Sequence, residues 1–285
     1  MNLIAVLLCI TLQKVINVAG NIKQSLFQFY LAKTNPLLVN LNGYLALALL
    51  VLPFAVLIGL LHFLTLGYLS GFIHLLFVTL ILFFCIDARD MERGVALSAY
   101  LQAMDKDQPE QAINAGETFV GEHITAGHSL ARTVTKVILT RSFTNIFAPL
   151  FWFAIADVYG VFIYYLLVHL QENASREATY VYLVRVTTTV LTILNWLPMR
   201  LLALIYALAG HFVNSFSHSY KEILSSSASF DHFVVDAALR ATDMDVDKEN
   251  KSSIKENRAV LSLVNRVLLI WVIALVLLTL GKWFA

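Results

Sequence analysis

Charged side chains are scarce in this chain of 285 residues. Asp, Glu, Lys and Arg make up only 14% of it, against about 25% in an ordinary soluble domain. Hydrophobic residues make up 59%. This balance excludes a soluble globular domain and predicts an integral membrane protein. The formal net charge of +1 provides no field that would attract a polyanion, so we expect no nucleic-acid partner.

Cysteine is also rare, and the two thiols, Cys9 and Cys85, both lie in apolar segments. Two isolated cysteines exclude a disulfide framework and a cysteine-based zinc site, so we expect both to be small buried hydrophobic residues. The chain has no glycine-rich phosphate loop and no nucleophile elbow. We therefore expect no cofactor and no metal, and the sequence assigns no catalytic residue.

Long runs without charge are abundant instead. From Thr34 to Ile86 there is no Asp, Glu, Lys or Arg, which is enough chain for two crossings of about 20 residues each, near 43–62 and 68–86. His62 and His74 fall in this run, and we expect an interfacial and a helix-packing role for them. Leu261–Leu280 forms the last crossing. The sequence predicts an all-α polytopic membrane protein with four or five spans.

The distribution of polar residues divides the chain into six segments. These are an amphipathic or partly inserted N-terminal helix (1–41), a transmembrane hairpin (42–86), a polar helical module (87–144), a membrane core (145–213), a polar and partly disordered region (214–262) and a C-terminal transmembrane helix (263–285). Six Lys and Arg residues in the polar module place it in the cytoplasm by the positive-inside rule. The mixed charge of Asp243–Asn257 predicts poor order there.

Asp157 is the one formally charged residue between Ser142 and Gln171. A carboxylate at membrane depth is costly and should face protein, water or headgroups. Two arrangements remain open: the helix crosses with Asp157 turned inward, or two half-helices meet at a break beside Gly160. We expect this segment to pack against Val190–Phe212. Arg200 in that second segment could pair with Asp157, snorkel to the surface or hold an anionic group.

The polar module contains its own cluster of acidic and imidazole side chains, Glu117, Glu122, His123 and His128. The two histidines are not spaced at i and i+4, the separation that places two ligands on one helix face, so we expect solvated side chains rather than a metal site. The candidate ligand-binding residues of the whole chain are Asp157, Arg200, Asn195, Glu117, Glu122 and His123.

Three apolar motifs carry a resemblance to known families. They are Ala148–Trp152 (APLFW), Leu194–Leu201 (LNWLPMRL) and Tyr206–His211 (YALAGH). In this combination the chain resembles the AmpE family and, less closely, the polytopic CobD/CbiB cobinamide-phosphate synthases. The AmpE resemblance implies a multi-pass protein of the bacterial inner membrane, linked to the AmpD amidase pathway and to β-lactamase induction.

The chain departs from the synthase pattern where that pattern is charged. The segments Val120–His123, Thr140–Asn145 and Tyr164–Gln171 stand in place of the three charged clusters of the synthases. An amide-forming ligase that uses a phosphorylated intermediate needs carboxylates for Mg²⁺ and cations for phosphate, and a retained scaffold does not imply retained chemistry. We therefore do not expect this reaction.

Three functions follow for comparison. The first is a regulatory or sensory membrane protein that binds a cell-wall-derived ligand or a partner. The alternative is a synthase-like enzyme with relocated groups at Glu117, Glu122, His123, Asp157 and Arg200. A transporter is disfavoured because intramembrane charge is almost absent. Besides the bilayer, the sequence identifies no partner by itself, and it leaves the oligomeric state open.

Overall fold

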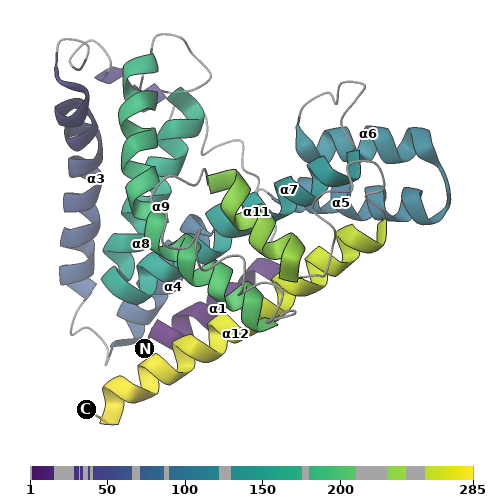
Figure 1. Ribbon diagram of the computed structural model, residues 1–285. Helices are drawn as coiled ribbons and strands as arrows, with labels where there is room; N and C mark the ends of the chain where they lie inside the picture. The colour runs from purple at the N-terminus through teal and green to yellow at the C-terminus, as the bar shows by residue number, and fades with distance from the viewer. Residues whose placement is uncertain are drawn as a thin grey trace. The chain divides into compact units, whose positions relative to one another are not determined.

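The computed structural model describes residues 2–15, 29–31, 33–34, 38, 41–65, 71–86, 90–121, 130–174, 180–209, 230–241 and 254–284 (Figure 1). Every regular element within these ranges is a helix. Four helical stretches are long and apolar enough to cross a membrane, namely Gly43–Thr65, Leu130–Ala174, Val181–Tyr206 and Asn257–Ala274. The protein is therefore an all-α polytopic membrane protein, and the predicted fold class is confirmed.

The described chain forms two compact units. The first unit comprises Met1–Arg89 and Ala148–Trp196, and the second comprises Asp90–Phe147 and Leu197–Phe284. Both units are discontinuous in sequence. The second unit contains most of the polar module together with the C-terminal helix.

Four complete helices and half of a fifth build the first unit. They are α1 (Asn2–Val15), α3 (Gly43–Thr65), α4 (Phe72–Cys85), α8 (Ala148–Ala174) and the first half of α9 (Val181–Ala209). Helix α1 packs against α4, and both α3 and α4 pack against α8. Cys9 and Cys85 are buried, as expected. Exposed leucines on α3, including Leu45, Leu49 and Leu52, form an apolar face suited to lipid.

Helix α4 is shorter than the second crossing that the sequence suggested near 68–86. Its 14 residues span about 21 Å, which is less than the roughly 30 Å hydrocarbon core of a bilayer. Helix α3, with 23 residues, is long enough to cross. The charge-free run from Thr34 to Ile86 thus contains one helix of full membrane length and one short apolar helix.

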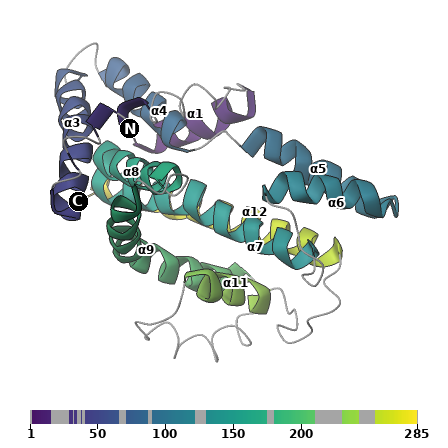
Figure 2. The ribbon, with the colours of Figure 1, turned by 90° about the horizontal axis from the view of Figure 1, so that it is seen from above.

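The second unit is built around the polar module. Its elements are α5 (Asp90–Asp105), α6 (Pro109–Val120), α7 (Leu130–Ser142), a π-helical turn (Phe143–Phe147), the second half of α9, α11 (Phe230–Ala241) and α12 (Ile254–Phe284). Helices α5 and α6 lie side by side (Figure 2). The α6 helix ends at Gly121, whose φ of 88° requires a residue without a Cβ.

Arg141 on α7 closes the end of α6. Its guanidinium donates hydrogen bonds to the carbonyl oxygens of Phe119 (2.6 Å) and Val120 (3.1 Å), and it lies 4.8 Å from the centre of the Phe119 ring. The last carbonyls of a helix lack intrahelical partners and carry partial negative charge, so a cation there stabilises the helix end.

A buried polar network joins three helices of this unit. Asn257 on α12 donates from Nδ2 to the Tyr100 hydroxyl (3.1 Å), and its Oδ1 accepts a hydrogen bond from the Thr135 hydroxyl (2.7 Å). Tyr100 and Asn257 are fully buried and Thr135 is 2% exposed. Because the amide satisfies one group on α5 and one on α7, it specifies how α12 packs against both.

This network bears on the expected disorder of Asp243–Asn257. Most of this range, Asp243–Ser253, lies outside the described residues. From Ile254 onward the chain is helical, and the fully buried Asn257 is anchored to α5 and α7. Poor order of Asp243–Asn257 therefore stays a prediction, although Asn257 at the end of that range is buried with hydrogen-bond partners rather than solvated.

A polar site at a break in helix α8

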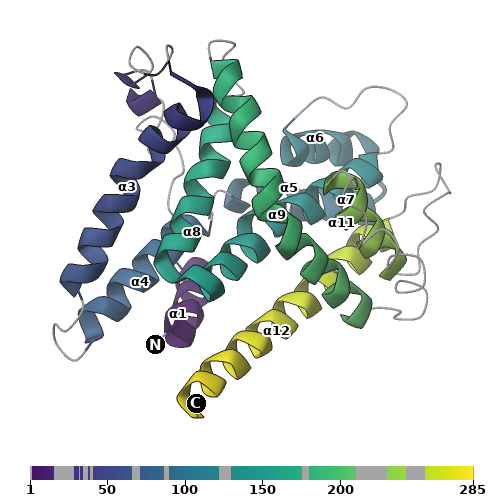
Figure 3. The ribbon, with the colours of Figure 1, turned by 60° about the vertical axis from the view of Figure 1, so that its left-hand side comes forward.

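Helix α8 is interrupted at Ala156 and Asp157 (Figure 3). Ala156 has φ −121° and ψ 17°, and Asp157 has φ 54° and ψ −145°. Residues eight positions apart in a straight helix are about 12 Å apart. Yet a Cβ placed on Gly160 would overlap the carbonyl oxygen of Trp152 and would lie 2.7 Å from the Cβ of Ala156. Of the two arrangements left open by the sequence, the structure shows two half-helices that meet at a break.

The backbone at Asp157 is strained, and the side chain partly offsets the strain. A positive φ is rare for a non-glycine residue, and with ψ at −145° Asp157 lies outside the left-handed helical region that Asp can adopt. Asp157 Oδ1 accepts a hydrogen bond from the Val158 backbone N–H at 2.9 Å, which satisfies one donor that the interrupted helix leaves without its usual partner. Such outliers cost about 1–3 kcal/mol and cluster at functional sites.

Two imidazoles and a phenol gather beside this break. His62 lies in the last turn of α3, His74 lies in the first turn of α4, and Tyr159 follows the break in α8. The His62 ring centroid lies 4.9 Å from that of His74 and 5.2 Å from that of Tyr159. Thr65 Oγ1 and His74 Nδ1 are 3.3 Å apart.

The Asp157 carboxylate belongs to the same helix as Tyr159, two residues before it. His62 Nδ1 is buried, with no hydrogen-bond partner among the described residues. The three helices α3, α4 and α8 thus bring two imidazoles and a phenol together beside the break that contains Asp157.

This cluster can accept or donate hydrogen bonds, but it is not arranged as a metal site. In the described parts of the chain, no group of three His, Cys, Asp or Glu side chains could hold a metal ion together. What the cluster offers is a polar surface at the junction of three apolar helices.

A second polar contact lies about four helical turns beyond Asp157 along α8. Gln171 Nε2 donates to Thr188 Oγ1 at 3.0 Å, which fixes an antiparallel register between α8 and α9. Seven residues back on α8 and seven forward on α9, the Asn195 side chain interacts with the Tyr164 hydroxyl. Among the described residues, the Tyr164 oxygen and Asn195 Oδ1 lack a hydrogen bond of good geometry, so this contact has unused hydrogen-bonding capacity.

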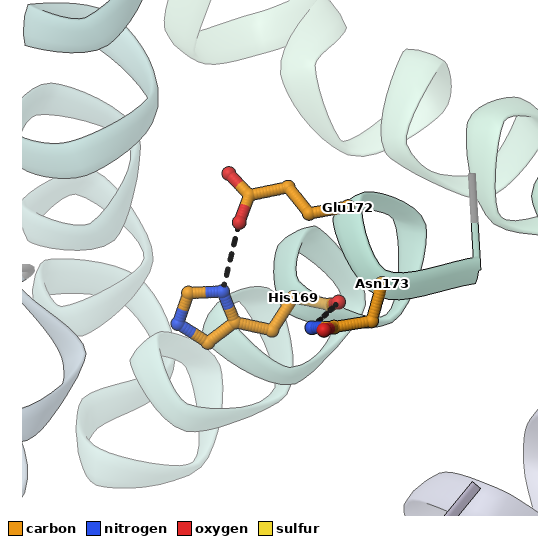
Figure 4. Close-up of polar contacts among 3 residues, drawn as sticks. All are labelled: His169, Glu172 and Asn173. Carbon is orange, nitrogen blue, oxygen red and sulfur yellow. Dashed lines mark hydrogen bonds and ion pairs between the residues drawn. The ribbon is translucent and has the colours of Figure 1, made fainter. Parts of the chain in front are cut away.

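A third group closes α8 (Figure 4). His169 Nδ1 lies 3.3 Å from the Glu172 carboxylate, and Asn173 Nδ2 donates to the His169 carbonyl at 2.8 Å. The Tyr165 ring lies against the imidazole, with centroids 4.1 Å apart. Glu172 is half exposed while His169 is nearly buried, so the pair joins the buried part of α8 to its surface.

The candidate residues from the sequence fall in different places. Asp157 and Asn195 are in the first unit, and Arg200 and Glu117 are in the second. Asn195 contacts Tyr164, which is about 10 Å along α8 from Asp157, so the two candidates of the first unit are not adjacent. Pairing of Asp157 with Arg200 stays a prediction. Glu122 and His123 lie outside the described residues.

Sequence reasoning missed the residues that accompany Asp157. His62 and His74 were interpreted separately, as interfacial and packing residues, whereas the structure brings them together beside Asp157. The signal that could have found them is the short α3–α4 connection, which places the end of one apolar helix beside the start of the next. His169 and Glu172 show the i, i+3 spacing of neighbours on one helix face, which is visible in the sequence.

Comparison with known proteins identifies one family. A family model described as "Regulatory signalling modulator protein AmpE" matches residues 1–282. No curated protein and no solved structure matches the chain.

Proposed function

The chain belongs to the AmpE family of regulatory signalling modulator proteins, and we propose that it modulates β-lactamase induction from the bacterial inner membrane. In this proposal it acts by binding a ligand or partner connected with the recycling of cell-wall fragments, and not by chemical turnover. The AmpE match supports the regulatory role. The binding mode, the β-lactamase pathway and the location in the inner membrane are our inference.

The observation that carries the proposal is the broken α8 helix with Asp157 at its break. Membrane proteins build binding sites where helices are interrupted, because the interruption frees backbone groups that a continuous helix would satisfy internally. Here the interruption places a carboxylate on a strained backbone position, two residues before Tyr159. The Tyr159 ring lies against His62, and the His62 ring lies against His74. A charged residue kept at such a cost inside an apolar unit marks a functional site by default.

We further propose that the α5–α6 pair faces the cytoplasm and contacts a soluble partner. The basic residues of the polar module support this orientation. Asn257 connects α12 to α5 and α7 through hydrogen bonds. A movement of the membrane part of α12 would therefore shift α5 and α7 as well.

The loss of the synthase's charged clusters supports binding over catalysis. A relation to the CobD/CbiB synthases keeps an amide-forming enzyme as the alternative. Complementation of a strain lacking cobinamide-phosphate synthase distinguishes them: growth restored by this chain would favour the enzyme.

The direct test is a β-lactamase induction assay in a strain that lacks the chromosomal copy and carries Asp157→Asn. Asp107→Asn is a matched control, because Asp107 also has a positive φ (55°) but lies outside the candidate spans. We expect Asp157→Asn to accumulate normally in the membrane and to change induction severalfold, while Asp107→Asn behaves as the parent. Normal induction by an Asp157→Asn protein present at parental level would exclude the site.

A further inference from the structure

A groove runs along one face of α12. Its volume is about 480 Å³, and it is open along its length. Its described lining side chains come from this helix and are Arg258, Leu261, Ser262, Asn265, Arg266 and Leu269. The first polar row, Arg258, Ser262 and Arg266, follows the i, i+4, i+8 spacing of one helix face.

The groove lies where α12 enters the apolar part of its sequence. The stretch long and apolar enough to cross a membrane runs from Asn257 to Ala274. Arg258 is the second residue of this stretch, and Arg266 is about 12 Å further along the axis. Long arginine side chains reach back toward the membrane surface, so both guanidinium groups belong at the level of the lipid headgroups.

The two arginines differ in their protein partners. Arg258 pairs with the Asp105 carboxylate on α5. Arg266 is exposed, and no hydrogen bond or ion pair joins it to another described residue. A cation inside a spanning stretch is unfavourable unless an anion or water compensates it. The groove therefore carries one positive charge that the described protein does not neutralise.

We propose that this groove binds the headgroup of an anionic phospholipid. The Arg266 guanidinium contacts the phosphate, since arginine and phosphate form strong charge-assisted hydrogen bonds. Ser262 and Asn265 contribute neutral hydrogen-bond donors beside it. Leu269, which is 61% exposed, packs against the start of an acyl chain. Along this face of α12 the polar donors come first, then the cation and then the apolar side chain. A phospholipid presents its polar headgroup, its phosphate and its acyl chain in the same order.

Such a lipid would act on the polar module through contacts already in place. Arg258 at the mouth of the groove is paired with α5, and Asn257 beside it is bonded to α5 and α7. Lipid binding in the groove therefore changes how α12 packs against α5 and α7. The signal that the protein modulates then depends on the lipid composition of the membrane. This step rests on the proposed regulatory function, whereas lipid binding itself does not.

The test measures lipid retention by the purified full chain in detergent. Fluorescent phosphatidylglycerol and phosphatidylcholine with identical acyl chains are titrated against the parent, Arg266→Gln and Arg266→Lys. Arg185→Gln is the matched control, because Arg185 is also exposed and lies near the start of another candidate span, Val181–Tyr206. The double variant Ser262→Ala/Asn265→Ala removes polar donors without changing charge.

We expect the parent to prefer phosphatidylglycerol, and Arg266→Gln to lose roughly fivefold of that preference, the usual effect of one cation near an anionic surface. Arg266→Lys should retain most of it, the double variant should lose part, and Arg185→Gln should match the parent. Equal binding of the two lipids would overturn the proposal, as would an equal loss in Arg185→Gln. Displacement by millimolar inorganic phosphate would overturn it too, since the groove would then be a site for soluble anions.

Discussion

Replacing Gly160 by alanine tests the break in α8 directly. The new Cβ would overlap the Trp152 carbonyl oxygen and lie 2.7 Å from the Ala156 Cβ. The carbonyl belongs to the backbone and cannot rotate away, so the two half-helices must separate. Overpacking of this kind costs about 1–3 kcal/mol, and we expect the upper end because two atoms clash and one is fixed.

Two other glycines of the first unit calibrate this value. A Cβ on Gly43 would overlap the end of the Val186 side chain, at 2.7 Å, and would be in ordinary contact with the Tyr182 carbonyl oxygen, at 3.7 Å. Valine has one preferred rotamer in a helix, so moving it should cost about 1 kcal/mol. A Cβ on Gly59 would lie 3.5 Å from the Tyr159 ring, an ordinary contact. Its replacement should be neutral or stabilising by about 0.5–1 kcal/mol, because alanine favours a helix.

Thermal unfolding of the three variants in one detergent, followed by tryptophan fluorescence, measures this order. A loss of about 3 kcal/mol corresponds to a midpoint lowered by roughly 6–12 °C in a chain of this size. We expect Gly160→Ala to fall furthest, Gly43→Ala to fall slightly and Gly59→Ala to match or exceed the parent. If Gly160→Ala and Gly59→Ala unfold at the same temperature, the half-helices do not approach as described and the reasoning fails.

Three further predictions concern the second unit. Asn257→Ala should destabilise it by about 2–4 kcal/mol, because it leaves the buried hydroxyls of Tyr100 and Thr135 without their partner; denaturant unfolding measures this, and a loss below 1 kcal/mol would contradict it. Burial raises the pKa of the Tyr100 phenol above its ordinary value of about 10, and the hydrogen bond from Asn257 lowers it by a smaller amount. The stability that the neutral phenol contributes is therefore complete below pH 10 and is lost as the pH rises through the folded-state pKa. Tyr100→Phe should therefore unfold less readily than the parent in alkaline titrations. A cysteine at the exposed position 107, Asp107→Cys, should stay unlabelled by an impermeant maleimide in intact cells and react after lysis; efficient labelling from outside would reverse the proposed orientation.

The helices could be predicted from the sequence because charge and apolar periodicity are local signals. The charge-free run after Thr34 contains α3, and the abrupt change at Asp87 precedes the polar module. The break at Asp157 was one of two alternatives, since a carboxylate and Gly160 in an apolar run are compatible with either. Only the three-dimensional approach of Trp152 to Gly160 shows which one the chain adopts.

The polar contacts could not be predicted, because their partners are far apart in the sequence. Asn257 and Tyr100 are separated by 157 residues, and no periodicity relates them. The length of α4 was also misjudged, since apolar composition alone does not locate a helix start. Gly71, with a φ of 81°, precedes that start, and a left-handed residue cannot continue a helix.

The surroundings of Asp157 change how its charge should be understood. From the sequence, Asp157 and Arg200 were the two isolated charges of the membrane core, and pairing was one way to lower the cost of burying each. In the structure, Asp157 has local compensation, because its Oδ1 accepts a hydrogen bond from the Val158 N–H. A ligand that competes for this oxygen removes the compensation and raises the free energy of the break. Because α3 and α4 both pack against α8, such a ligand changes how the three helices pack together.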